Sequence, residues 1–348
     1  MLKRVLMVGP DRSVQGGISG VVNNYYEAGL DKQIGLKYIG TMIDGSKLKK
    51  LMKASLSYMQ FAACVRKYDI VHVNMAADAS YYRKLYFIKL AKLFHKKLVI
   101  HQHGGDVENF FDKNAKGKRR ERMYKTLNQA DKFIVLAPIW KEFFGNILPR
   151  EKIVVLPNGI TLPEYSLQDK DYTNYDIVFV GRLCKEKGIR ELFAAVECLQ
   201  EKYPNIHLYL GGKWEDDALR EQQKRMQKNV TYLGWLDSAG KRDILSRCSI
   251  FVMPSYFEGQ CIAVLEAMAY GCATIATRVG GLQQTFMDGE DGILVAPKET
   301  EGLRNALEHL LTNIEEKKRI GIAGREKVQM QFDIEVIKKK LVDLYQTI

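Results

Sequence analysis

Two glutamates lie eight residues apart in the stretch YFEGQCIAVLEAMAYGCATIAT, residues 256–277. Glu266 falls inside an apolar segment that reads as a helix ended by Gly271. A buried carboxylate costs on the order of several kcal/mol unless it is paired or hydrogen-bonded. The partner of Glu266 is therefore either a cation across the core or the hydroxyls of a ligand, such as a ribose. Glu258, beside the backbone N–H groups of residues 259–261, could hold a second hydroxylated ring.

Two cations precede another predicted helix, in DIVFVGRLCKEKGIRELFAAV, residues 176–196. Arg182 and Lys187 lie on the short loop between a strand-like run and this helix. Loop cations beside a helix N-terminus form a site for phosphate or diphosphate, although two solvated surface charges would give the same pattern. Gly181 begins the same loop. Gly211 and Gly212 end the next strand-like run, where glycines let the backbone approach a ligand or simply make a turn.

Short apolar runs rich in Val and Ile alternate with amphipathic stretches such as 190–203 and 301–314. Runs that are apolar at successive positions are typical of strands buried on both faces of a parallel sheet, and their alternation with helices indicates an α/β fold. The runs are 4–9, 69–74, 97–105, 132–137, 153–159, 176–182, 206–212, 249–255, 273–277 and 292–295.

The pattern restarts after a polar stretch at residues 162–175. This predicts a first domain over 1–165, a second over 166–332, and a last helix over 333–348 that crosses back to the first domain. Two doubly wound, Rossmann-like parallel sheets facing each other would leave a cleft at the carboxyl ends of their strands, where such sheets bind ligands.

The net charge of +12 is unevenly distributed along the 348 residues. Residues 1–165 hold 28 Lys and Arg against 14 Asp and Glu, so the first half carries +14 and the second −2. The cations gather in 45–55, 81–97 and 113–125, among apolar and aromatic residues. No nucleic-acid motif accompanies them. Such segments are typical of a solvated helix face or of a surface that binds an anionic membrane. The uneven charge of the two halves favours membrane binding.

Several classes of protein are disfavoured. No apolar run approaches the length of a membrane span, and the first ten residues hold too short an apolar run for a signal peptide. The six cysteines form no CxxC pair and no metal-ligand cluster with the six histidines, as expected for a reduced cytoplasmic protein. GPDRSVQGGISG lacks the spacing of a dinucleotide-binding loop, which disfavours a nicotinamide dehydrogenase.

EGQCIAVLEAMAYGCATIATRVGG resembles the E-x7-E region of retaining glycosyltransferases of family 4, which have the GT-B fold. The resemblance extends over most of the chain. GPDRSVQGGISGVV looks like the glycine loop after the first strand, VIHQHGGD like the histidine segment of the first domain, VVLPNGI like the closing Asn-Gly turn, and GRLCKEKGI like the diphosphate-binding segment.

The resemblance implies a role for each matched residue. Arg182 and Lys187 would bind the donor diphosphate, Glu266 the donor ribose, and Glu258 the donor sugar. His103 would touch the donor sugar from the first domain. His101 competes for this role, but the family's histidine usually directly precedes a glycine. The remaining implied donor-binding residues are glycines and the residues after Glu258, namely Gly16, Gly17, Gly181, Gly211, Gly212, Gly259, Gln260, Cys261 and Ile262.

The expected function is retaining transfer of a sugar from a nucleotide-diphosphate donor, UDP before GDP, to a lipid-linked glycan of a cell-surface polysaccharide. No metal or other cofactor is expected, and the enzyme would sit on the cytoplasmic face of the membrane. Gln260, Cys261, Lys213 and Trp214 depart from the family pattern, so sugar and base are not assigned. A sugar-nucleotide epimerase of the same fold and a non-catalytic nucleotide-sugar-binding protein are the alternatives.

Overall fold

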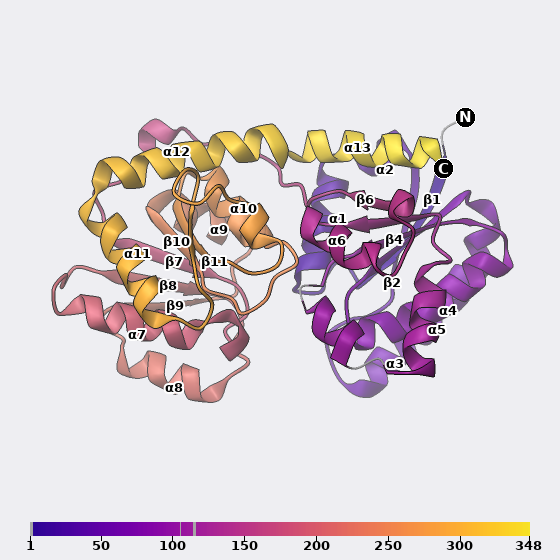
Figure 1. The fold of residues 1–348 in the computed structure, drawn as a ribbon, viewed down its shortest axis with the longest axis horizontal. Helices are drawn as coiled ribbons and strands as arrows, with labels where there is room; N and C mark the ends of the chain where they lie inside the picture. Colours follow the sequence, from indigo (N-terminus) through magenta and orange to yellow (C-terminus); the bar gives the residue numbers. More distant parts are fainter. Residues whose placement is uncertain (1–2, 105, 114–115) are drawn as a thin grey trace. The chain divides into compact units, whose positions relative to one another are not determined.

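The computed structural model describes residues 3–104, 106–113 and 116–348 (Figure 1). Gly105, at the end of a predicted strand, and residues 114–115 of a basic segment lie outside the described residues. The chain divides into two compact units, Met1–Thr161 with Asp333–Ile348, and Leu162–Phe332. The boundary after Thr161 lies four residues before the expected one, and the last helix groups with the first unit.

The first unit is built on a six-stranded parallel sheet in the order β2-β1-β3-β4-β5-β6. Its strands are β1 (Arg4–Gly9), β2 (Gly35–Gly40), β3 (Ile70–Met75), β4 (Lys97–Gln102), β5 (Lys132–Val135) and β6 (Ile153–Val155). Its helices are α1 (Gly17–Glu27), α2 (Leu30–Gln33), α3 (Lys47–Cys64), α4 (Ala79–Leu93), α5 (Lys118–Leu127), α6 (Pro138–Gly145) and α13 (Ile334–Thr347). The order reverses between β1 and β3, which makes that position the switch point of the sheet.

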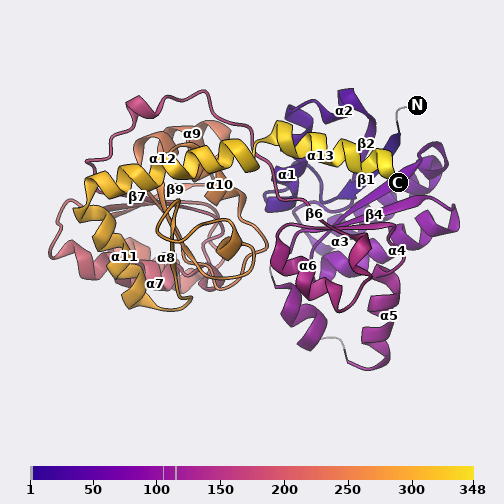
Figure 2. The same ribbon diagram turned by 45° about the horizontal axis from the view of Figure 1, so that its top comes forward.

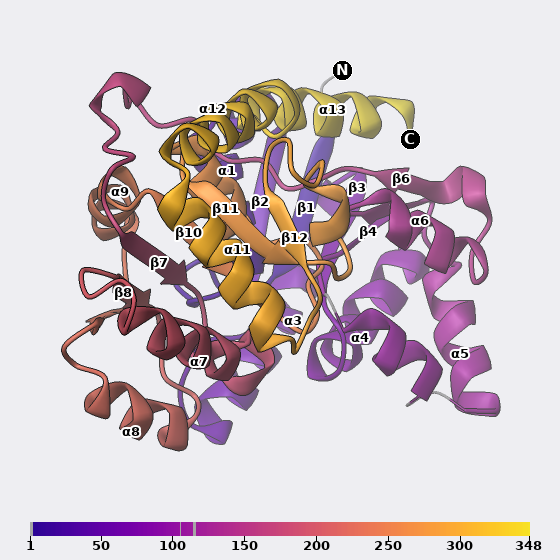
Figure 3. The ribbon, with the colours of Figure 1, turned by 60° about the vertical axis from the view of Figure 1, so that its left-hand side comes forward.

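The second unit repeats this plan with the order β12-β11-β10-β7-β8-β9. Its strands are β7 (Asp176–Val180), β8 (His207–Gly211), β9 (Val230–Gly234), β10 (Ile250–Met253), β11 (Ala273–Thr277) and β12 (Ile293–Val295). Its helices are α7 (Ile189–Gln200), α8 (Asp217–Arg225), α9 (Ser238–Arg247), α10 (Ile262–Ala269), α11 (Thr300–Thr312) and α12 (Ile314–Gln331). Within this unit α7 packs beside α11 (Figure 3), and α10 packs beside α12.

The predicted α/β class with two parallel sheets is confirmed. Two strands were missed, β2 (GLKYIG) and β9 (VTYLG), and each lies at the edge of its sheet. An edge strand is covered less completely than a central one, so its sequence does not need an unbroken apolar run. The central strands β3 and β11, by contrast, are buried at every residue.

Helix α13 completes the core of the first unit by packing along α1 (Figure 2). Its Tyr345 is buried, and the Tyr345 hydroxyl lies 2.7 Å from Nδ1 of His72 on β3. The His101 ring on β4 follows, with its centroid 5.3 Å from that of His72. His72 and His101 are fully buried. Neither ring nitrogen of His101 has a hydrogen-bond partner among the described residues.

Burial keeps these histidines neutral. It lowers the pKa of His72 to about 3 and that of His101 well below its usual value, with neighbouring histidines adding to the effect. In the unfolded chain the same side chains bind protons below a pH of about 6.5. Protons therefore favour the unfolded chain as the pH falls from about 6.5 toward 3, and stability is lost over that window.

We expect His101→Leu to flatten this pH dependence. One such histidine accounts for about 2 kcal/mol of the stability lost between pH 7.5 and pH 5. Denaturant unfolding at both pH values measures the difference, with the surface substitution His95→Asn as the control that keeps the wild-type slope. An unchanged slope in His101→Leu would show that His101 is protonated in the folded protein.

Candidate functional site

The loops that carry most of the predicted site residues follow three adjacent strands of the second sheet. Strand β7 lies between β10 and β8, so the carboxyl ends of all three meet at one edge. The strand order reverses between β7 and β10, and a switch point of this kind is where doubly wound sheets bind ligands. The loop after β7 carries Arg182 and Lys187, and the loop after β10 carries Glu258. Sequence spacing had identified both loops.

Lys187 and Glu258 form an ion pair across this switch point. Their side chains are only 15% and 12% exposed, and Ser255 Oγ donates a second hydrogen bond to the same carboxylate oxygen at 3.0 Å. Burial by itself would lower the pKa of Lys187, but the Glu258 carboxylate outweighs it and the pKa is raised. The pair therefore holds the Lys187 ammonium group in a fixed position just before α7.

Arg182 is held by a residue that the sequence reasoning missed. Its Nη1 lies 2.8 Å from Oε2 of Glu215. A parallel bridge between Leu183 and Trp214 aligns the two loops, with the Leu183 N–H donating to the Lys213 carbonyl at 2.8 Å. Lys213 and Trp214, which depart from the family pattern, directly precede Glu215 in the chain.

Glu266 has a cation partner in the structure. It lies on α10 and forms an ion pair with Lys241 of α9, and both side chains are about a quarter exposed. The carboxylate is thus neither buried in the core nor unpaired, which removes the expected burial cost. Lys241 follows no motif, so its sequence position offered no signal. The predicted helix itself is confirmed, since α10 ends before Gly271, whose φ of +71° is left-handed.

The turn into α10 is formed by Gly259, Gln260 and Cys261, and Ile262 is the first helical residue. Gln260 is buried and Cys261 is partly exposed. Burial, aided by the Glu258 carboxylate, raises the pKa of the Cys261 thiol to about 12. Cys261 is therefore a neutral thiol near pH 7 and not a nucleophilic thiolate.

The glycines of the site fall into two groups. Gly212 has a φ of +146°, and a side chain there would collide with the carbonyl of Gly181. A Cβ on Gly211 would instead meet the side chain of Leu236. Gly16 and Gly17, at the start of α1 in the first unit, are different, because a Cβ on either would meet no described atom within 4 Å. The fold explains the first group, whereas the second has no packing reason to be glycine.

His103 and His101 are distinguished by burial. His101 is fully enclosed in β4, whereas His103 follows the strand and is partly exposed. Asn74 Nδ2 donates to the Val8 carbonyl, which directs its Oδ1 to His103 Nε2 at 2.8 Å. Nε2 therefore carries the proton. Burial lowers the pKa of His103 to about 3, so Nδ1 is an acceptor, and among the described residues it has no partner.

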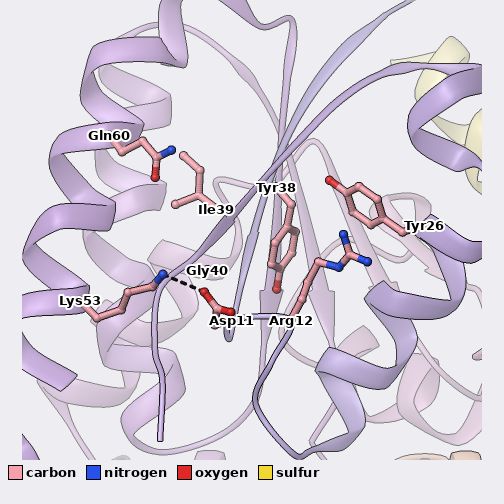
Figure 4. Close-up of a pocket in the computed structure, with 8 residues that line it drawn as sticks. All are labelled: Asp11, Arg12, Tyr26, Tyr38, Ile39, Gly40, Lys53 and Gln60. Carbon is pink, nitrogen blue, oxygen red and sulfur yellow. Dashed lines mark hydrogen bonds and ion pairs between the residues drawn. The ribbon is translucent and has the colours of Figure 1, made fainter. Parts of the chain in front are cut away.

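The first unit also holds a polar pocket that sequence reasoning did not find (Figure 4). Its volume is about 270 Å³. The Asp11 carboxylate pairs with Lys53 Nζ at 2.7 Å on one side, and the Arg12 guanidinium stacks over the Tyr26 ring at 3.9 Å on the other. The complete lining is Asp11, Arg12, Tyr26, Tyr38, Ile39, Gly40, Lys53 and Gln60. Its size and its charged and hydroxyl groups suit a sugar-sized polar ligand.

We expect alanine substitutions to separate the two groups of glycines. Gly212→Ala should destabilise the second unit by on the order of 2–4 kcal/mol, because it combines backbone strain with overlap. Gly16→Ala and Gly17→Ala should change stability by less than about 0.5 kcal/mol. If these two nevertheless lose activity, the space is used by a ligand. Thermal unfolding and a transfer assay test both points, and equal destabilisation by Gly16→Ala and Gly212→Ala would make the first loop structural as well.

Two family models match this chain. Residues 34–163 match the model described as Glycosyltransferase Family 4, and residues 174–313 match Glycosyl transferases group 1. Glycogen synthase of Mycobacterium tuberculosis is 27% identical over 209 residues, which are 59% of this chain and 50% of that protein. The capsular polysaccharide biosynthesis glycosyltransferase CapM of Staphylococcus aureus is 26% identical over 220 residues, 58% of this chain and 57% of that protein. The chain thus spans about half the length of these curated relatives.

The fold matches solved GT-B glycosyltransferases over nearly its whole length. Sucrose-phosphate synthase from Thermosynechococcus elongatus has a TM-score of 0.82 at 22% identity, covering 99% of this chain and 98% of that one. Anabaena HepE in complex with UDP-glucose has a TM-score of 0.79 at 16% identity, covering 99% and 100%. With two parallel doubly wound sheets and a family model matching each unit, the chain belongs to glycosyltransferase family 4.

Proposed function

We propose that this protein is a retaining glycosyltransferase that uses a nucleotide-diphosphate sugar. The observation that carries the proposal is the cation pair Arg182 and Lys187 on the loop after β7, at the switch point of the second sheet. Each cation is held by a carboxylate, Arg182 by Glu215 and Lys187 by Glu258. Lys187 is mostly buried and Arg182 is about half exposed, and two oriented cations at this edge are suited to bind a diphosphate.

The same two cations provide the chemistry of the reaction. When the bond to the anomeric carbon breaks, negative charge develops on the departing diphosphate. Cations that are already oriented stabilise this charge without reorganisation, and this is usually the largest catalytic contribution. Arg182 and Lys187 would then do the work that a divalent metal does in other phosphate chemistry, and the proposed reaction needs no metal.

The donor is proposed to be a UDP sugar, with a GDP sugar as second choice. HepE was solved with UDP and with UDP-glucose, which supports this order. Glu266 would accept hydrogen bonds from the ribose hydroxyls, exchanging part of its contact with Lys241 for them. Glu258 would bind the donor sugar. His103 Nδ1 is buried without a hydrogen-bond partner among the described residues, and it would accept a hydrogen bond from a sugar hydroxyl.

The acceptor is proposed to be a lipid-linked glycan, such as a polyprenyl-diphosphate sugar, of a cell-surface polysaccharide. CapM acts in capsular polysaccharide biosynthesis, and a phosphatidyl-myo-inositol mannosyltransferase of Mycobacterium leprae is 27% identical over 201 residues, 56% of this chain and 54% of that protein. Among the described residues, no helix is long and apolar enough to cross a bilayer. We propose peripheral attachment to the cytoplasmic face of the membrane through the basic first unit.

An epimerase of the same fold is the second candidate, because it would use the same nucleotide-sugar contacts. It would convert donor without any acceptor, so product formed in the absence of acceptor would favour it. A non-catalytic binding protein would bind UDP, yet it would show no turnover for Lys187 substitutions to reduce.

Glu266→Gln and Lys241→Gln together test the ribose contact. Both break the same ion pair, but only the first removes the carboxylate. Saturation with UDP at about 100 times its Kd should stabilise the wild type by about 2.7 kcal/mol. We expect Glu266→Gln to weaken UDP binding roughly tenfold or more, and Lys241→Gln to keep it. Thermal shift and calorimetric titration with UDP, GDP, ADP and CMP provide the measurement.

The following outcome would contradict the proposed ribose contact of Glu266. If both variants lower the melting temperature alike and bind UDP as the wild type does, Glu266 serves only the ion pair. A response to GDP and not to UDP would change the proposed base and leave the ribose contact intact.

Lys187→Gln tests the stabilisation of the leaving group. We expect kcat to fall on the order of 100- to 1,000-fold, because a preorganised charge is lost in the transition state. Lys202→Gln, on an exposed pair with Glu308, is the matched control and should keep wild-type kcat. Wild-type turnover should also survive EDTA, and loss of activity that Mg²⁺ or Mn²⁺ restores would contradict the metal-independent mechanism.

A further inference from the structure

Helix α3 turns its more apolar face away from the protein. Five large apolar side chains along it are at least half exposed: Leu48 at 67%, Leu51 at 65%, Met52 at 56%, Leu56 at 58% and Met59 at 58%. Counted from Leu48, the other four side chains lie three, four, eight and eleven residues further along the chain, which places all five on one side of a helix. A helix that only covers a sheet shows the reverse pattern, with its apolar residues facing inward.

The inner face of α3 is narrow, since only Ser57, Phe61 and Cys64 are buried along it. Among its buried residues Phe61 and Cys64 are apolar, and Ser57 donates to the Gly40 carbonyl at 2.6 Å. Lys53 reaches Asp11 in the polar pocket. The helix is thus attached to the unit by its polar flank and its last turn, and the outward apolar stripe contributes nothing to that attachment.

The neighbouring helices extend the same surface. Tyr58 on α3 meets Tyr86 on α4 edge to face, with ring centroids 6.3 Å apart, and Tyr86 is 62% exposed. Leu93, further along α4, is exposed as well. Arg119 on α5 hydrogen-bonds to the hydroxyl of Tyr82 on α4. The exposed side chains of the three helices are apolar, aromatic and basic, and we call the surface that they form the α3–α5 face. Figure 1 shows the course of the three helices.

The charge of the α3–α5 face is almost entirely positive. The three helices contain thirteen Lys and Arg, of which Lys84 is buried, and one acidic residue, Glu121. Lys47, Lys49 and Lys50 are exposed at the start of α3, beside the apolar stripe. Apolar side chains flanked by cations fit an anionic lipid surface, whose phosphates meet the cations while its acyl chains receive the apolar groups.

Other partners fit this face less well. Nucleic acid would pair with the cations but would leave the five apolar side chains in water. A second copy of this chain would cover the stripe but would bring two strongly positive faces together. An anionic bilayer satisfies both features at once.

We propose that α3 is a membrane-docking helix that lies in the plane of an anionic bilayer with Leu48, Leu51, Met52, Leu56 and Met59 inserted among the lipids. This deepens the proposed function, since it rests on the acceptor being lipid-linked. Docking of α3 would also place the polar pocket of the first unit close to the membrane. Lys53 and Gln60 line that pocket from the same helix, so docking holds the pocket within about one helix diameter, ~10 Å, of the lipid headgroups (Figure 4).

The test is co-flotation of the full chain with vesicles of equal parts phosphatidylglycerol and phosphatidylcholine, and with pure phosphatidylcholine vesicles. The variant is the double substitution Leu51→Ser and Leu56→Ser. Its matched control is Ile314→Ser with Met330→Ser, which removes two exposed apolar side chains from α12 in the second unit. All four positions are exposed, so each variant should fold, and its UDP-dependent thermal shift verifies this.

We expect the wild type to bind the anionic vesicles and to keep part of that binding at about 0.5 M NaCl, where surface charges are screened. The α3 variant should lose roughly tenfold or more in partition coefficient and all of the salt-resistant binding. The α12 control should bind as the wild type does. Substituting Lys47, Lys49 and Lys50 by Gln should weaken binding at low salt by about fivefold per lysine.

Three results would overturn the docking helix. Equal vesicle binding by the wild type and the α3 variant would show that the apolar side chains of α3 do not contribute to membrane binding. Absence of wild-type binding to anionic vesicles would exclude the membrane, and a dimer that the α3 variant dissociates would identify a second copy as the occupant. Vesicle binding without any UDP response would instead contradict the proposed function and leave the docking helix standing.

Discussion

A parallel sheet collects the loops that follow its strands along a single edge, and both units of this protein depend on that constraint. In the second unit it brings Arg182, Lys187 and Glu258 to the carboxyl ends of β7 and β10. In the first unit it gathers the glycine loop after β1 and His103 after β4. Residues far apart in the chain thus become neighbours because their strands are adjacent.

Within that frame the site is organised by paired charges. Lys187 is paired with Glu258, Arg182 with Glu215, and Glu266 with Lys241. A partly buried ion pair, such as Lys187 with Glu258, holds both side chains in one geometry, whereas the Arg182–Glu215 pair is about half exposed. A ligand that enters has to compete with, or share, these internal partners. The candidate site is therefore ordered before a ligand binds. Its affinity for a ligand depends on the difference between the contacts made with the ligand and the internal ion pairs that are lost.

The first unit shows a different use of polar groups. Its sheet buries His72 and His101 as neutral rings, and α13 covers them through Tyr345. On the other side of the same sheet, α3 buries only Ser57, Phe61 and Cys64 and leaves five large apolar side chains exposed. Both features reverse the usual distribution of polarity. A core tolerates imidazole rings that stay neutral, which accounts for the first feature. The second feature is the basis for the proposed docking of α3 on a membrane.

The α/β class, the repeated sheet plan and the loops after β7 and β10 could be predicted from the amino-acid sequence, because buried strands leave long apolar runs and the predicted site residues follow those runs directly. It did not reveal the edge strands β2 and β9, which are too exposed to need such runs. The partners Glu215 and Lys241, the polar pocket and the direction in which α3 faces were decided only by tertiary structure. Each depends on which side chains packing brings within reach, and a linear spacing contains no such information.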